Sequence, residues 1–263
     1  MYVLSAKYSE DTNGYTRHFH DAHELLYIVE GRISVNVGEE EREADAGSLL
    51  VFSRFEEHSV RVLTRQYKRY TLLIAPDVVL GSENYVLSSV LINRSGGFER
   101  VLDLKNTENE ISLLLKNMAR EYLDKPPMYD KTLDSMLMCL LISLYRAHPQ
   151  LFPETENANT EIVRDIQGRF ERVCSEKFTL AALAAEYHVS PSHLSHIFKS
   201  VTGYAPIEYL MICRISAAKA LLSTTDKSIK EIIDLCGFSD ESNFSRTFRE
   251  KVGVTPSQFR KIT

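Results

Sequence analysis

The chain has 263 residues, a formal net charge of -5, 44% hydrophobic and 25% charged residues, ordinary values for a globular protein of two domains. No apolar run is long enough to span a bilayer, and the N-terminus lacks the basic-then-apolar layout of a signal peptide. The four cysteines are scattered, without a Cys-x-x-Cys pair. These features argue against membrane and disulfide-rich secreted classes and predict a cytoplasmic protein with reduced thiols.

Short β-rich segments separated by glycines follow one another in the N-terminal third. Residues 25–37 predict a hairpin that turns near Gly31. Gly38, Gly47 and Gly81 separate further strand-like segments at 48–53, 58–63 and 70–75. Short strands at this spacing indicate an antiparallel barrel or sandwich. The mouth of a barrel is a natural site for a small molecule.

A His-x-His-x3-Glu pattern opens this region. On alternating strand geometry His18, His20 and Glu24 share one face, where they can converge with His58 in the barrel mouth. Three imidazoles and a carboxylate suit a divalent transition metal such as Mn, Fe, Ni or Zn. The alternative is a polar lining that hydrogen-bonds an organic effector.

The same spacing resembles the two signature motifs of the cupin family. The family's metal ligands map onto His18, His20, Glu24 and His58. The second motif departs from the family pattern, because its usual Pro, Gly and Asn are replaced by Ser53, Phe55 and Val62.

Two helices are predicted after the barrel. Thr107 and Glu110 form a capping box, Pro126-Pro127 ends the first helix, and residues 129–148 form a second, more apolar one. A helix this apolar needs cover from more than one side, so we expect one face on the barrel and the other on a second copy of the chain. The proline-containing polar run that follows predicts a linker.

The last hundred residues contain an internal repeat. Leu180 and Leu183 match Ile229 and Ile232 at an offset of 49, and a second group matches at an offset of 50: Phe198, Gly203, Pro206 and Tyr209 with Phe248, Gly253, Pro256 and Phe259. Each copy reads as a short helix, a tight turn and a second helix, which is the helix-turn-helix layout. Ser190-Pro191, Ser239 and Thr255-Pro256 are the expected helix starts.

A long helix over residues 207–223 joins the two copies and can hold them one DNA turn apart. From Thr160 to Thr263 the chain has 14 Lys and Arg against 12 Asp and Glu, a net charge of +2, which leaves -7 for the remainder. This split is compatible with a nucleic-acid module at the C-terminal end.

The segment 160–263 resembles the DNA-binding domain of the AraC/XylS family. The family pattern is carried by Gly237-Phe238, Phe244, Arg246, Phe248-Arg249, Gly253 and Thr255-Pro256. The cupin-like barrel followed by a helical pair is also similar to that family's effector-binding and dimerisation region. The resemblance therefore implies an α+β protein with an effector-binding barrel at 1–100, a helical dimerisation segment at 101–150, a linker at 151–159 and an all-α domain with two helix-turn-helix units at 160–263.

Carried over by position, the resemblance implies base contacts from Ser192, Ser195 and His196 in the first unit and from Glu241, Ser242, Asn243 and Arg246 in the second. The chemistry agrees, since Arg can bond guanine bidentately, Asn suits adenine and Glu can accept from cytosine. Phosphate contacts are expected from Lys199, Arg249 and Lys251.

The resulting prediction is a transcription regulator, and not an enzyme, that binds double-stranded DNA under the control of a small metabolite. The resemblance favours a sugar as the effector, a homodimer, no membrane partner and, if the protein is an activator, contact with RNA polymerase. No cofactor is required by this prediction, and a divalent metal stays open. The alternatives are a metal-dependent cupin enzyme with a regulatory tail, and a ligand-independent regulator with a structural barrel.

Overall fold

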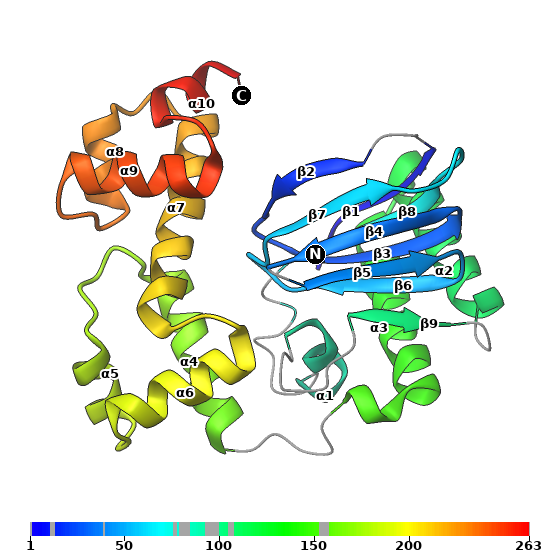
Figure 1. Ribbon diagram of the computed structural model, residues 1–263, viewed down its shortest axis with the longest axis horizontal. Helices are drawn as coiled ribbons and strands as arrows, with labels where there is room; N and C mark the ends of the chain where they lie inside the picture. The colour runs from blue at the N-terminus through cyan, green and yellow to red at the C-terminus, as the bar shows by residue number, and fades with distance from the viewer. Residues whose placement is uncertain are drawn as a thin grey trace. The chain divides into compact units, whose positions relative to one another are not determined.

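The chain folds into two compact units, which the computed structural model describes over residues 2–10, 14–38, 40–75, 78, 85–92, 100–104, 108–152 and 158–262. The first unit includes Phe152 and the second starts at Ala158 in the described chain (Figure 1). Gly81, Thr107 and the centre of the expected linker, residues 153–157, lie outside the described residues. Among the described helices, none is both long and apolar enough to cross a membrane.

Two antiparallel sheets form the first unit. The five-stranded sheet has the order β1-β8-β3-β6-β9 and the four-stranded sheet the order β2-β7-β4-β5. The strands are β1 (Val3–Glu10), β2 (Tyr15–His18), β3 (His23–Glu30), β4 (Arg32–Val37), β5 (Glu40–Asp45), β6 (Ser48–Phe52), β7 (His58–Val62), β8 (Lys68–Ile74) and β9 (Val101–Asp103).

The inner faces of the two sheets share one apolar core. Leu26 and Ile28 of β3 pack in the same buried cluster as Ile33 and Val35 of β4. These residues alternate with side chains that point the other way, as expected of strands with one face in a barrel interior. The predicted cupin-like barrel is confirmed, and the strand-like segments at 48–53, 58–63 and 70–75 are β6, β7 and β8.

The predicted hairpin at Gly31 is wrong in its pairing. The chain does turn there, but β3 pairs with β6 and β8 while β4 pairs with β5 and β7. The apolar residues of β3 and β4 meet across the barrel interior instead of side by side in one sheet. Gly31 has a φ of 99°, and a Cβ there would lie 2.3 Å from the Gln66 carbonyl oxygen. Only glycine fits this crossing between the sheets.

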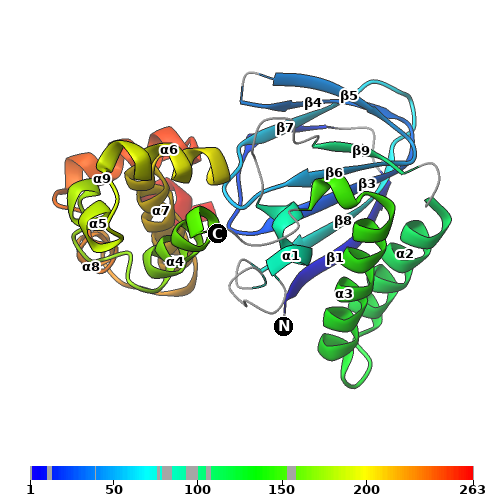
Figure 2. The same ribbon diagram turned by 90° about the horizontal axis from the view of Figure 1, so that it is seen from below.

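Helices cover the outer face of the five-stranded sheet (Figure 2). They are α2 (Glu108–Asp124) and α3 (Tyr129–Ala147), with the short α1 (Tyr85–Ser88) before them. Leu133, Leu137 and Leu141 of α3 share a buried cluster with Leu25 and Tyr27 of β3. This explains why β3 is buried on both faces. The expected packing of the apolar helix on the barrel is thus confirmed, whereas its contact with a second copy stays a prediction.

The second unit is helical. Its elements are α4 (Ala158–Arg172), α5 (Leu180–Glu186), α6 (Pro191–Thr202), α7 (Pro206–Thr224), α8 (Ile229–Leu235), α9 (Glu241–Val252) and α10 (Pro256–Ile262). α5 with α6, and α8 with α9, are the two helix-turn-helix units, and α7 runs between them (Figure 1). Leu210, Ile215, Ala218 and Leu222 of α7 are buried.

The repeat in the sequence is also a repeat in geometry. The rings of Phe198 and Tyr209 meet edge to face at 5.6 Å and 72°, and those of Phe248 and Phe259 at 5.7 Å and 73°. The first turn closes with the Val189 amide donating to the Ala184 carbonyl, and the second with Phe238 donating to Ile233. Each turn contains one residue of positive φ, His188 at 55° and Gly237 at 73°.

Glycine is needed at 237 for a second reason. A Cβ there would lie 2.5 Å from the Ser175 carbonyl oxygen and 2.6 Å from the Ser175 Cα. The segment between α4 and α5 therefore packs directly against the turn of the second helix-turn-helix unit. Gly253, which ends α9 with a φ of 85°, has open space around it.

Replacing these two glycines separates the cost of backbone conformation from the cost of close packing. Gly253→Ala should lower the free energy of unfolding by about 1–2 kcal/mol, the cost of a left-handed alanine. Gly237→Ala carries the same cost and also forces backbone atoms of Ser175 to move, so its loss should be clearly larger. Urea unfolding of both full-length variants measures the difference. Equal losses would contradict the packing of Ser175 on Gly237.

Candidate functional site

Side-chain caps fix where the second helix of each unit begins. The Ser190 hydroxyl accepts the His193 amide at 3.1 Å, with Pro191 at the first helical position, as predicted. In the second unit the cap is Asp240, whose carboxylate accepts the Asn243 amide at 2.7 Å. The prediction of Ser239 as the cap is wrong, because the second turn is one residue longer. Ser239 instead donates to the Asp240 carboxylate at 3.1 Å.

The exposed face of α6 carries the predicted base contacts of the first unit. Ser192 and His196 are exposed and Ser195 is half-buried, whereas Leu194 and Phe198 lie in the core. The face therefore offers hydroxyl and imidazole groups on a helix held from behind by apolar residues.

The exposed face of α9 is more strongly polar. Glu241, Ser242 and Arg246 are exposed and Asn243 is half-buried, while Phe244 and Phe248 are fully buried. The side-chain oxygen of Asn243 accepts from Arg246 Nη2 at 3.4 Å and from Thr247 Oγ1 at 3.4 Å. Arg246 and Asn243 are thus held together on the surface before any ligand binds.

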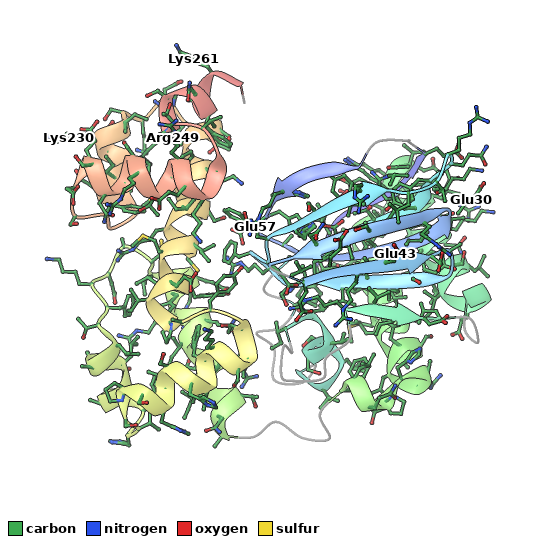
Figure 3. All side chains as sticks on the ribbon, viewed as in Figure 1. Glu30, Glu43, Glu57, Lys230, Arg249 and Lys261 are labelled. Carbon is green, nitrogen blue, oxygen red and sulfur yellow. The ribbon has the colours of Figure 1, made fainter. Side chains whose placement is uncertain are left out.

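The predicted phosphate contacts lie near the ends of the same helices. Lys199 and Arg249 are exposed at repeat-equivalent positions in the last turns of α6 and α9. Lys251 is half-buried, with its Nζ 4.0 Å from Glu208 Oε1. Figure 3 shows Lys230, Arg249 and Lys261 on the helical unit and Glu30, Glu43 and Glu57 on the barrel unit, as the charge split of the sequence suggests.

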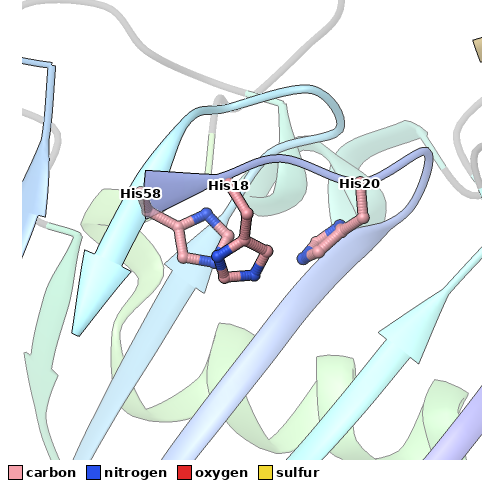
Figure 4. A group of neighbouring side chains, drawn as sticks. All are labelled: His18, His20 and His58. Carbon is pink, nitrogen blue, oxygen red and sulfur yellow. The ribbon is translucent and has the colours of Figure 1, made fainter. Parts of the chain in front are cut away.

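A second polar cluster lies at one end of the barrel (Figure 4). His18 ends β2, His20 lies in the connection to β3, Glu24 is on β3 and His58 begins β7. The expectation that the first three share one strand face is therefore wrong, because the chain turns between His18 and Glu24. They converge nonetheless: His18 pairs with His58 in one sheet, and Glu24 reaches them from the other.

Glu24 lies at the centre of this cluster. Its Oε2 is 2.7 Å from His20 Nε2 and 3.2 Å from His58 Nε2. Burial alone would raise the pKa of Glu24, but hydrogen bonds and charge from His20 and His58 outweigh burial and hold the pKa at about 2. Burial opposes the charged form of His58, yet its contacts with Glu24 raise the pKa above the ordinary value.

The arrangement of the rings fits a divalent metal. The Nδ1 atoms of His20 and His58 face the carbonyl oxygens of Ala22 at 3.0 Å and Glu56 at 2.9 Å, so each Nδ1 carries the hydrogen. The Nε2 atom of each ring points at Glu24, and a metal bound there would take the place of the hydrogen that lies between them. Metal-binding histidines are typically anchored in this way.

Two more observations bear on that fit. His58 Nε2 is buried and lies 3.2 Å from Glu24 Oε2. The ligand atoms of His18, His20 and His58 lie within 4.8 Å of one another. If a metal is bound, these three residues and Glu24 would hold it.

The sequence did not reveal a further polar group inside the barrel. Arg69 of β8 is buried, and its guanidinium carbon lies 4.9 Å from the Tyr67 ring centre and 5.2 Å from that of Tyr15. Burial and the nearby Tyr67 raise the pKa of Tyr15. Arg69 lies opposite Ile28 of β3, and facing residues of paired strands share a side of the sheet. Arg69 could be recognised as an interior residue only from the strand register, which cannot be read from the sequence.

Comparisons with known proteins match both units. A helix-turn-helix domain model matches residues 183–262, and a cupin domain model matches residues 7–73. The transcriptional activator RhaS of Salmonella schwarzengrund is 26% identical over 259 residues, covering 94% of this chain and 88% of RhaS. The chain belongs to the AraC/XylS family.

Other relatives match over shorter stretches. The arabinose operon regulatory protein of Escherichia coli is 34% identical over 46% of this chain, which spans 40% of that protein. LumQ of Photobacterium leiognathi is matched over 59% of its length, so several relatives are covered by less than two thirds. These proteins are named as regulators of transcription, which supports a regulator over the cupin-enzyme alternative.

The solved structure of ToxT from Vibrio cholerae has the same fold. It superposes with a TM-score of 0.65 at 16% identity and covers 99% of this chain and 98% of ToxT. This likeness confirms the order of a β-rich cupin-like unit followed by a helical unit.

The cap of α9 can be tested by substitution. Asp240→Ala should lower the free energy of unfolding by about 1 kcal/mol, because the Asn243 amide loses its acceptor. Asp240→Asn keeps an acceptor and should lose much less. Ser239→Ala removes only a contact to the cap and should be close to wild type. Urea unfolding that ranked Ser239→Ala as the most damaging would restore the original prediction.

Proposed function

We propose that the chain is a sequence-specific regulator of transcription that binds double-stranded DNA through α6 and α9. The observation that carries this proposal is the repeated pair of capped helices, each with buried aromatic residues behind and an exposed polar face in front. The second helix of such a unit is the one that enters the major groove. Ser192, Ser195, His196, Glu241, Ser242, Asn243 and Arg246 are the proposed base contacts.

The packing of α7 between the two helix-turn-helix units supports contact with two successive major grooves. α7 packs against α6 on one side and against α8 and α9 on the other, within one compact unit. Two reading helices held in this way would meet turns of the major groove about 34 Å apart along B-DNA. Lys199, Arg249 and Lys251 are the proposed phosphate contacts, which set position without reading sequence.

Arginine variants of α9 test this assignment. Arg246→Ala should cost about 1–3 kcal/mol at one base pair and relax discrimination there, because a guanidinium reads guanine bidentately. Arg249→Ala is the matched control on the same helix. It should weaken binding evenly across sequences and reduce the salt slope by about 1. Fluorescence anisotropy with a panel of single-base operator variants measures both effects, and equal behaviour of the two variants would contradict the assignment.

A small-molecule effector is proposed for the barrel, with His18, His20, Glu24 and His58 as its polar contacts. A sugar is the first candidate, supported by the arabinose operon regulatory protein among the relatives. A carboxylic acid is the second, supported by ToxT structures with an unsaturated fatty acid and with a naphthalenyl butenoic acid. A thermal-shift screen of the full chain distinguishes them, since a ligand of the folded state raises the melting temperature. No shift with either class would favour the structural-barrel alternative.

The proposed partners follow from the same surfaces. Homodimerisation through the helical segment is supported by Leu113 and Leu123, which expose 58% and 80% of their area on α2. An activating role, with RNA polymerase as the partner, is supported by the name of RhaS as an activator.

A divalent metal is a further candidate ligand of the barrel cluster, because the ligand atoms of His18, His20 and His58 lie within 4.8 Å of one another. Isothermal titration with Zn²⁺, Ni²⁺ and Mn²⁺ should show one site per chain. His58→Gln should weaken binding by at least about ten-fold, as expected for loss of a ligand set member. His193→Gln, an exposed histidine of α6, is the control and should bind as wild type does. Equal affinities in the two variants would place any metal elsewhere.

A further inference from the structure

Arg214, near the middle of α7, holds the segment between α4 and α5. Its Nε donates to the Cys174 carbonyl oxygen and its Nη2 to the Glu176 carbonyl oxygen, both at 2.8 Å. A guanidinium is a planar fork of donors, so two such bonds fix orientation as well as distance. The backbone on either side of Ser175 is therefore tied to α7 by one side chain.

The same segment has contacts that lead to the core behind α6. The Phe178 ring meets the Phe170 ring of α4 edge to face at 5.0 Å, and the ring centre of Phe170 lies 6.3 Å from that of Phe198 in α6. Phe170 and Phe198 are fully buried. The segment that Arg214 holds is thus joined to the first helix-turn-helix unit through three aromatic rings.

The segment also touches the second helix-turn-helix unit. The turn between α8 and α9 packs so closely on it that a Cβ at Gly237 would lie 2.5 Å from the Ser175 carbonyl oxygen. The Arg214 guanidinium carbon lies 6.0 Å from the ring centre of Phe238, the next residue of that turn. Phe238 in turn meets the Phe244 ring of α9 edge to face at 5.0 Å. Contacts from Arg214 and Ser175 therefore reach the core behind α9 as well.

The repeat shows that a turn of this kind can form without such a contact. At the offset of 49 residues His188 corresponds to Gly237, and both have positive φ. His188 is exposed, whereas the backbone of Ser175 lies directly against Gly237. The effect of the contact at Gly237 is to join the second unit to the segment that belongs to the first.

We propose that Arg214 is a positioning residue for DNA binding, which fixes the spacing of α9 relative to α6 by holding one segment against the cores of both units. The inference rests on the proposed binding of DNA by these two helices. Arg214 contacts no base in this proposal, and it acts through the backbone around Ser175 and through Phe238.

Loss of the Arg214 bonds should loosen this spacing without unfolding the chain. Ile212 and Ile215 bury the apolar side of α7. That core stays intact in Arg214→Met, which keeps an unbranched apolar stem and removes every donor. The carbonyl groups of Cys174 and Glu176 can then turn to water, because the first residue is half-buried and the second is exposed.

The test measures how strictly the full chain requires the spacing of its operator. Selection from randomised duplexes with wild type gives the operator, and one base pair is then added or removed between the two contact sites. One base pair moves a site by roughly 3.4 Å along the axis and roughly 35° around it. Anisotropy titrations give the ratio of the affinity for the selected operator to that for each altered duplex.

This ratio separates positioning from stability, because a variant that only destabilises the fold loses the same active fraction on every duplex. Arg260→Met is the matched control. The half-buried Arg260 of α10 likewise donates to a backbone carbonyl, that of Lys227, at 2.5 Å. Its bond joins α10 to the segment before α8 and leaves the segment between α4 and α5 untouched. Thermal unfolding shows whether each variant is folded at the assay temperature.

For wild type and Arg260→Met the ratio should be at least about ten-fold, as expected when a base contact is lost. Arg214→Met should lower it to within about three-fold, less than the cost of one lost contact, because α9 can follow the displaced site. It should still bind the operator more tightly than a duplex with one contact site. Arg214→Lys, whose point charge replaces the fork, should fall between them, and it carries the test if the methionine variant does not fold.

A folded Arg214 variant with the wild-type ratio would overturn the inference. Equal relaxation in Arg260→Met, a wild-type ratio near one, or a relaxed Arg214 variant that binds no better than to a single contact site would overturn it as well. Each of these results leaves DNA binding intact. A wild-type chain that selects no duplex would instead refute the proposed function itself.

Discussion

The packing of α7 between the two helix-turn-helix units is the constraint on which the helical unit depends. Tyr209 near its start rests on Phe198 of α6, and α10, which packs on α7, brings Phe259 against Phe248 of α9. Both aromatic pairs have nearly the same geometry, so α6 and α9 are held by equivalent supports. Because Ile212 and Ile215 are buried on the helix between them, neither unit can rotate without opening this core.

Contacts between segments distant in the sequence complete this support. Arg214 of α7 donates to the carbonyl oxygens of Cys174 and Glu176, and Gly237 packs on the intervening Ser175. The connection between α4 and α5 is thus held by both α7 and the second turn. The barrel uses the same kind of convergence, since its histidine and glutamate cluster takes residues from both sheets. In each unit the polar side chains of interest lie where separate elements meet, and the apolar core behind them fixes their relative positions.

Local signals in the sequence predicted the helical unit well. Ser190-Pro191, the glycines after α6 and α9, and the spacing of Phe244 and Phe248 each have a local physical meaning, so the helices and their buried faces could be placed. The barrel was harder, because strand pairing depends on register between distant segments. Gly31 marked a turn, but nothing local showed that β3 and β4 enter different sheets. Arg69 and the central place of Glu24 depend on that register.

In the proposed function, α6 and α9 read two sites on DNA at a fixed spacing because α7 joins them rigidly. The most direct measurement is the affinity of the full chain for its selected operator after five or ten base pairs are inserted between the two contact sites. Both insertions should reduce the affinity to that of a single contact site, because the rigid helical unit cannot stretch to reach the displaced site. Undiminished affinity after either insertion would contradict a rigid pair of reading helices.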